Sequence, residues 1–182
     1  VGVILDIDRA KKSEQQLTTR ASFDALTELY NRETIESQID NEITLSEARK
    51  SEMAVLFIDV DDFKHYNDQY SHATGDQVLK FVARTIKGTV NEFGFAGRYG
   101  GDEFIACIRN AEINDPTRAA QDIISKLEEG FECDGVHLTV SVCIGISMIK
   151  DDYNTRVEYI IGKADDAMYS VKKNGKSNYA FI

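Results

Sequence analysis

Two glycines stand directly before two carboxylates near the middle of the chain, in the run Arg98–Phe104. Gly100 and Gly101 have no side chain, so the backbone is free to take positive φ and a ligand can approach it closely. Because apolar segments flank this run, we expect a hairpin turn that presents Asp102 and Glu103 at its exit. Such a turn suits a phosphate and a metal ion. A solvated acidic hairpin tip is an equally good interpretation of these residues alone.

A second group of acids, Asp59, Asp61 and Asp62, follows the apolar run at residues 53–58. An uninterrupted apolar run predicts a buried central strand. If this strand pairs beside the hairpin, carboxylates from both places meet at one edge of the sheet. Magnesium prefers carboxylate oxygens together with substrate phosphates, and two such ions can hold the attacking and leaving oxygens of a nucleotidyl transfer. Acidic loop residues that only keep the surface soluble are the alternative.

Composition limits the choices further. The 182 residues are enough for one domain of ordinary size and a short appendage. A net charge of -10 disfavours a nucleic-acid surface, and no apolar run approaches the length that spans a bilayer. Cys107, Cys133 and Cys143 have neither zinc-site spacing nor the pattern of a disulfide framework, so we expect reduced cysteines.

The elements that must position the acids are read from hydrophobic spacing and end signals. Pro116 suits the first position of a helix, and Ile35, Ile39, Ile43 and Leu45 suit the apolar face of another. We expect helices over residues 32–50, 63–70, 77–87, 115–129 and 155–173, and strands over residues 53–58, 93–99, 103–108, 138–148 and 177–181. This order predicts an α/β sandwich with a mixed sheet.

Several motifs occur together. Residues 59–68 read D-x-D-x-F-K-x-x-N-D, His72 and Gly75-Asp76 follow, and residues 98–104 read R-Y-G-G-D-E-F. In this order they resemble the GGDEF family of diguanylate cyclases. Further matches are Asp24-Ala25-Leu26-Thr27 and Asn31-Arg32 upstream, and Ala164-Asp165, Tyr169, Lys172, Gly175 and Asn178 downstream. The resemblance covers residues 23–182 as one GGDEF domain.

The resemblance implies both a fold and a reaction. The fold is α+β and ferredoxin-like, related to the polymerase palm and adenylyl cyclases, with a mainly antiparallel sheet flanked by helices. The reaction condenses two GTP into cyclic di-GMP with release of two pyrophosphates, using two Mg²⁺ or Mn²⁺ ions per active site. Each site holds one GTP and its 3′-hydroxyl attacks the α-phosphate of the other, so the resemblance implies a homodimer.

Metal and catalytic roles come from the same resemblance. Asp59, the backbone carbonyl of Val60 and Asp102 would hold the ions. Asp102 and Glu103 would form the catalytic edge. Asp102 is also the family's proposed base for the attacking hydroxyl, but a metal-bound carboxylate is a poor base, which favours its metal role.

Guanine recognition is assigned by the resemblance to Asn67 and Asp76. An aspartate accepts from guanine N1–H and N2–H, whereas adenine offers no matching pair of donors, so Asp76 would supply selectivity. The other residues that would surround the GTP are Asp62, Phe63, Lys64, His72, Arg98, Gly100, Gly101, Lys172 and Lys176.

The chain departs from the family pattern at a few positions. Glu28 and Ser71 stand where glycine is usual, and Lys176 stands where arginine is usual, which loses the bidentate fork that arginine offers a phosphate. The family's product-inhibition motif, R-x-x-D, falls on Asn91–Gly94, where both the arginine and the aspartate are missing. We therefore predict that the domain has no inhibitory product site.

Residues 1–17 resemble the last strand of a PAS sensor domain and the helical linker that commonly follows it. We thus expect residues 1–22 to be the end of an upstream sensor, in a cytoplasmic part of a longer protein. A catalytically silent GTP-binding GGDEF domain that regulates a neighbour is the alternative to an enzyme. Silent domains usually have a damaged signature, and here the signature is intact.

Overall fold

A five-stranded sheet forms the centre of the computed structural model, which describes residues 22–150 and 154–182. Its strands follow the order β2(Gly94–Arg98), β3(Glu103–Arg109), β1(Met53–Val60), β6(Val142–Ile149) and β7(Asn178–Phe181). All neighbours are antiparallel except β6 and β7, which run parallel. The predicted mixed, mainly antiparallel sheet is confirmed. The strand and linker helix expected over residues 1–22 lie outside the described residues, apart from Ser22.

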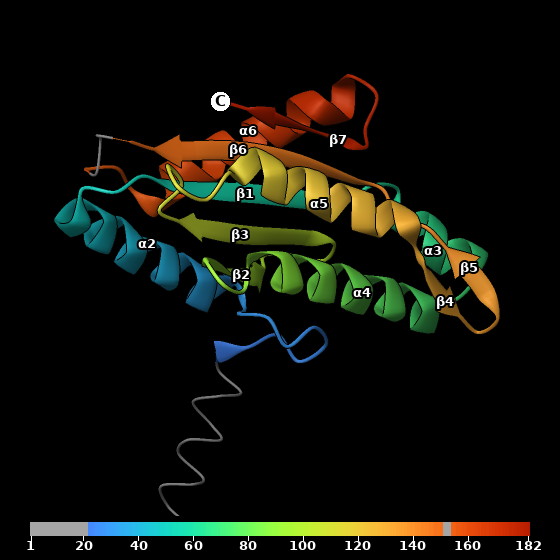
Figure 1. Ribbon diagram of the computed structural model, residues 1–182. Coiled ribbons are helices and arrows are strands. Elements are labelled where there is room, and N and C mark those ends of the chain that lie inside the picture. Colours follow the sequence, from blue (N-terminus) through green and yellow to red (C-terminus); the bar gives the residue numbers. More distant parts are fainter. Residues whose placement is uncertain (1–21, 151–153) are drawn as a thin grey trace, which may run out of the picture.

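Helices cover both faces of the sheet. On one face α4(His72–Val90) and α5(Pro116–Glu129) pack on the side chains of Leu56 and Ile58, and Figure 1 shows both helices in front of the strands. On the other face α2(Arg32–Arg49) and α6(Val157–Lys173) pack on Val55 and Phe57. Because successive residues of a strand point to opposite faces, β1 is buried at every position, as its apolar run predicts.

Sequence signals locate most helix ends. Pro116 occupies the first turn of α5, and Asp115 caps it by accepting from Thr117 N–H (2.9 Å). Leu45 is an exception to the expected apolar face of α2, because it is 37% exposed while Ile35, Ile39 and Ile43 are buried. It follows Ile43 by only two positions and therefore points to a different side of the helix.

The predicted start of α4 is wrong by about one turn. The helix begins at His72, because the Ser71 hydroxyl accepts from the Thr74 N–H (3.1 Å) and caps it. Ser71, which departs from the family's glycine, thus has a local role. The earlier start places His72 and Asp76 in the first turns of this helix.

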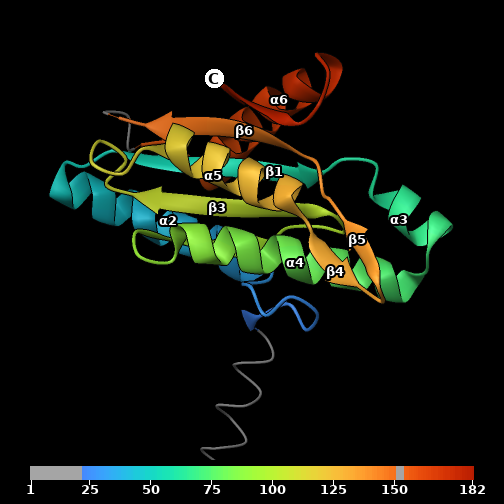
Figure 2. The same cartoon turned by 45° about the vertical axis from the view of Figure 1, so that its right-hand side comes forward.

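The strand expected over residues 138–148 is also wrong in extent. The structure instead contains a small hairpin of β4(Phe131–Cys133) and β5(Val136–Leu138), and β6 begins only at Val142. Asp134 (φ 49°) and Gly135 (φ 79°) form its two-residue turn, for which Asp-Gly is a strong sequence signal. Figure 2 shows this hairpin and α3(Phe63–Gln69) at the end of the sheet where β1 finishes and β3 starts.

Candidate active site at the end of β1 and β3

The register between β1 and β3 brings the two predicted acid groups together. Asp59 lies opposite Glu103, and the Val60 N–H donates to the Asp102 carbonyl oxygen at 3.1 Å. The strand carrying Asp59 therefore pairs beside the hairpin, as the sequence predicts. Asp59 still belongs to β1, which continues to Val60 rather than ending at Ile58.

Burial and mutual repulsion perturb these carboxylates. Burial raises the pKa of Asp59 to about 6, and the charges of Asp102 and Glu103 add to this, whereas Lys172 opposes it. The Lys172 Nζ lies 2.8 Å from Asp59 Oδ1. Burial, followed by the charges of Asp102 and Asp165, also raises the pKa of Glu103. The edge holds more negative charge than its lysine balances, so it would favour a bound cation.

The donor set fits divalent ions that share their ligands with a substrate. Within residues 22–150 and 154–182, no group of three or more His, Cys, Asp or Glu side chains is arranged to hold a metal by itself. Asp59 and Asp102 nevertheless supply the hard carboxylate oxygens that magnesium prefers, and magnesium commonly takes its other ligands from phosphates and water. A complete protein cage is therefore not required here.

Gly100 and Gly101 form the turn, but not through positive φ. Neither glycine has its backbone in the left-handed region, so this part of the prediction is wrong. A Cβ on Gly100 would lie 2.5 Å from Glu103 Oε2, whereas a Cβ on Gly101 would meet nothing within 4 Å. Neither backbone conformation nor packing within the described chain explains the missing side chain at Gly101, which is consistent with close approach of a ligand.

Arg98 links the Gly100-Gly101 turn to the upstream Asp24. Its guanidinium donates to the Gly101 carbonyl oxygen at 2.7 and 3.2 Å, and pairs with Asp24 at 3.2 Å. Burial alone would raise the pKa of Asp24, but hydrogen bonds from Thr27 and the charge of Arg98 lower it overall. Asp24 belongs to the upstream motif and was not predicted as a site residue. Direct contact of Arg98 with substrate stays a prediction.

Of the two predicted guanine-reading residues, Asn67 on α3 packs against the α4 residue that directly precedes Asp76. A Cβ on Gly75, the residue before Asp76, would collide with the Asn67 Oδ1 and lie 3.3 Å from Phe63 Cζ. The Asn67 amide therefore packs directly on the α4 backbone at the position next to Asp76. Asp76 is exposed, as is His72 one turn earlier.

Lys176 meets the other end of the site. Its Nζ lies 2.8 Å from both carboxylate oxygens of Asp62, and this contact lowers the pKa of Asp62. Asp62 precedes α3 with φ 51°, in the left-handed region, and Phe63 and Lys64 form the first turn of that helix. An adjoining groove of about 360 Å³ is lined by Asp61, Asp62, Lys176 and the flank of α3. Four of the residues predicted to surround the GTP are thus close to one another, namely Asp62, Phe63, Lys64 and Lys176.

One carboxylate near the catalytic edge was not among the predicted site residues. Asp165 on α6 influences Glu103 electrostatically, and burial, followed by the charge of Asp166, raises its own pKa. Its signal was present in the downstream match at Ala164-Asp165. It lies one helical turn before Met168 and two turns before Lys172, on the helix that carries the lysine of the site.

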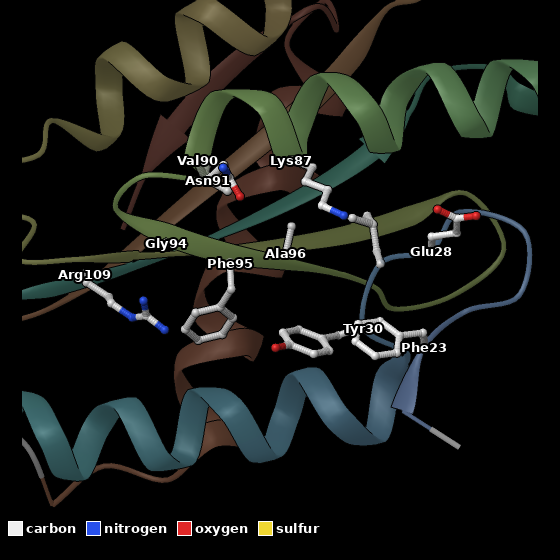
Figure 3. A pocket seen from close by; sticks show the side chains of 11 residues that line it. Phe23, Glu28, Tyr30, Lys87, Val90, Asn91, Gly94, Phe95, Ala96 and Arg109 are labelled. Carbon is white, nitrogen blue, oxygen red and sulfur yellow. The ribbon is translucent and has the colours of Figure 1, made fainter. Parts of the chain in front are cut away.

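The stretch that aligns with the family's inhibitory motif lies away from this edge. Asn91 and Gly94 line a pocket of about 290 Å³ together with Lys87, Tyr30 and Phe95, as Figure 3 shows. None of the predicted site residues lines it. A Cβ on Gly94 would collide with the backbone carbonyl of Cys107. An aspartate at this position would therefore require β2 to shift.

Comparison with known proteins identifies the family. The profile described as "Diguanylate cyclase, GGDEF domain" matches residues 21–178. This chain belongs to the GGDEF family. The chain is 33% identical over 178 residues to the signaling protein YkoW of Bacillus subtilis, covering 97% of this chain and 22% of YkoW. It is 35% identical over 158 residues to diguanylate cyclase DosC of Escherichia coli, covering 85% of this chain and 34% of DosC.

Solved structures support the fold of this GGDEF domain. The GGDEF domain of YfiN (TpbB) from Pseudomonas aeruginosa superposes with a TM-score of 0.81 at 33% identity, covering 87% of this chain and 93% of that one. The coiled coil and GGDEF domain of DgcB from Caulobacter crescentus, solved with c-di-GMP, superposes with a TM-score of 0.91 at 23% identity. This match covers 99% of this chain and 95% of that one. The predicted palm-like α+β fold is confirmed.

The chain spans only about a fifth to a third of the length of the curated relatives named above. No helix among the described residues is both long enough and apolar enough to cross a bilayer.

Proposed function

We propose that this domain condenses two GTP molecules into cyclic di-GMP and two pyrophosphates. The observation that carries the proposal is the antiparallel register that sets Asp59 opposite Glu103 and joins Val60 to Asp102. It gathers carboxylates at one sheet edge, beside a lysine and an open glycine backbone. The match to a family described as diguanylate cyclase supports the same reaction.

In this proposal Asp59, Asp102 and the Val60 carbonyl hold two Mg²⁺ or Mn²⁺ ions. When bound, the ions neutralise the phosphates and stabilise the attacking and leaving oxygens of the in-line displacement. Glu103 is suited to accept the proton of the 3′-hydroxyl, because burial and neighbouring charge raise its pKa towards the range of a general base. Lys172 balances the charge of Asp59 and can interact with the triphosphate.

Selectivity for guanine rests on Asn67 and Asp76. The Asp76 carboxylate accepts two hydrogen bonds from the guanine edge. A bound base would cover this carboxylate, and adenine would leave it without matching donors. The Asn67 amide is fixed against Gly75, so it is oriented before the base arrives. The open backbone at Gly101 and the ammonium groups of Lys64 and Lys176 are proposed to contact the triphosphate.

The proposed reaction needs two domains face to face. One site binds one GTP, and the 3′-hydroxyl that attacks it belongs to the GTP in the partner site. We therefore propose a homodimer, at least transiently, and an upstream sensor in the longer protein that sets how the two domains meet.

The test is incubation of the chain with GTP and Mg²⁺ at a series of protein concentrations, with the product identified by mass. Cyclic di-GMP is expected, with a rate that rises more steeply than linearly with protein concentration while the dimer is weakly populated. Asp59→Ala is expected to abolish turnover while the fold persists. A chain that binds GTP through Asp76 but forms no cyclic dinucleotide at any concentration would instead be a silent GTP-binding domain.

A further inference from the structure

Asp61 is a buried carboxylate that joins three segments of the chain behind the proposed triphosphate site. It is only 6% exposed. Its Oδ2 accepts from the Ser141 hydroxyl and from the Ser177 N–H (3.3 Å), and its Oδ1 accepts from the Cys143 thiol (3.0 Å). Its own N–H donates to the Ser141 carbonyl oxygen at 2.9 Å. The end of β1 is thereby tied to β6 and to the turn between α6 and β7.

The partners of Asp61 use its oxygens for the protein itself. Burial, followed by the hydrogen bond with Asp61, raises the pKa of the Cys143 thiol to about 12, so the thiol keeps its proton and donates it. Three donors occupy most of the acceptor positions that a carboxylate has. The contacts therefore indicate a structural anchor for neighbouring residues, and leave little of Asp61 for a ligand.

The turn that Asp61 holds has an unusual backbone. Gly175, Lys176 and Ser177 have φ of 119°, 61° and 45° in succession. Non-glycine residues in the left-handed region persist only where the surrounding structure holds them there. Two hydrogen bonds restrain Ser177: its N–H donates to Asp61, and its hydroxyl donates to Glu128 Oε1 (2.6 Å).

Lys176 points from this turn to Asp62, but their ion pair cannot hold the turn. The two side chains are 42% and 71% exposed, and exposed pairs contribute little to conformation because solvent screens them. The partly buried hydrogen bond from the N–H of the next residue, Ser177, to the buried Asp61 carboxylate is less screened by solvent. Asp61 therefore restrains the turn, and the exposed Asp62 only pairs with the lysine that the turn carries.

We propose that Asp61 is a positioning residue for nucleotide binding: it holds the Lys176–Ser177 turn so that the Lys176 ammonium faces the triphosphate of GTP. This inference rests on the proposed function. The direction of the effect separates it from simple electrostatics. Removing a negative charge near a triphosphate would by itself strengthen binding, whereas loss of positioning weakens it.

The experiment measures binding of a GTP analogue whose α and β phosphorus atoms are joined by methylene, which cannot release pyrophosphate. Asp61→Ala is expected to weaken its binding by about tenfold, as for one lost contact between charged groups, and Asp61→Asn, which keeps an acceptor oxygen, is expected to weaken it less. In a Lys176→Ala background, Asp61→Ala should cause no further loss, because the two residues act through one contact. Independent, additive losses would overturn the proposal.

Two controls separate positioning from general damage. Guanosine lacks the triphosphate, so its binding, followed by NMR, should be the same in wild type and Asp61→Ala. Cys143→Ala removes the donor to Asp61 Oδ1, the oxygen that does not accept from Ser177, and should leave binding of the analogue unchanged. Equal loss of both ligands, or unchanged or tighter binding of the analogue, overturns the inference.

Failure to fold, failure to bind and additive losses lead to different conclusions. If Asp61→Ala does not fold, Asp61→Asn takes its place in the comparison with and without Lys176→Ala. The loss of affinity should again depend on Lys176 and should be smaller. If the wild-type chain binds neither the analogue nor guanosine, the proposed function itself fails. If the wild type binds both ligands and the losses from Asp61→Ala and Lys176→Ala are additive, only the proposed role of Asp61 fails.

Discussion

Replacement of Gly75 by alanine separates binding from stability, because the two effects have different causes. The new Cβ would collide with Asn67 Oδ1 and lie 3.0 Å from Asn67 Cγ, so this side chain must move. Asn67 is on α3, a short helix without a fully buried residue, and can move without disturbing the core. We therefore expect the domain to fold and the base site to lose its oriented amide.

The magnitudes follow from this geometry. Alanine in place of glycine inside a helix contributes about 1 kcal/mol, and displacing Asn67 from its rotamer costs about the same, so the net change in the free energy of unfolding is expected near zero. Each neutral hydrogen bond lost to guanine costs about 1 kcal/mol, which is about fivefold in affinity, or about thirtyfold for two bonds. Binding of ATP should change little, since the triphosphate contacts are untouched.

Gly88 provides a matched control in the same helix. A Cβ there would meet nothing within 4 Å. Gly88→Ala is expected to raise the midpoint of thermal unfolding by about 2–4 °C and to leave GTP binding unchanged. Calorimetric titration with the methylene analogue and thermal unfolding supply both readouts. If Gly75→Ala bound the analogue as tightly as wild type, Asn67 would not contact the base.

Three further predictions concern charge, space and feedback. Burial raises the pKa of Asp59 from 3.8 to about 6, so its contribution to stability is fully present below pH 3.8 and is lost as the pH rises through 6. Without metal, Asp59→Asn should therefore be more stable than wild type at pH 7. The gain in the free energy of unfolding, measured in urea, should be at most about 3 kcal/mol. Gly101→Ala should keep wild-type stability and weaken analogue binding, whereas Gly145→Ala, whose Cβ would collide with the α6 backbone, should lose about 3 kcal/mol of stability by the same measurement. Cyclic di-GMP should not bind the nucleotide-free domain tightly through Asn91–Gly94 in calorimetric titration, and micromolar or better affinity at this surface would contradict the absence of an inhibitory site.

Local sequence signals were sufficient where one interaction decides the structure. The apolar run of β1 predicted its burial, and Pro116 with Asp115 predicted the start of α5, because burial and capping depend on a few neighbouring residues. The Asp134-Gly135 hairpin was equally readable and was overlooked. The start of α4 was missed because the Ser71 cap was read only as a departure from glycine.

The candidate site divides in the same way. The motifs determined which residue types are available: two acid groups, a glycine pair, a guanine-reading pair and lysines near the C-terminus. What only the tertiary structure decided is how these groups meet. Strand register sets Asp59 opposite Glu103, and packing of α3 on α4 brings Asn67 against Gly75, the residue before Asp76. Arg98 turns back to the Gly101 carbonyl, and Asp61 reaches a turn more than a hundred positions away. Such contacts depend on how distant segments pack, and no local pattern of residues records that.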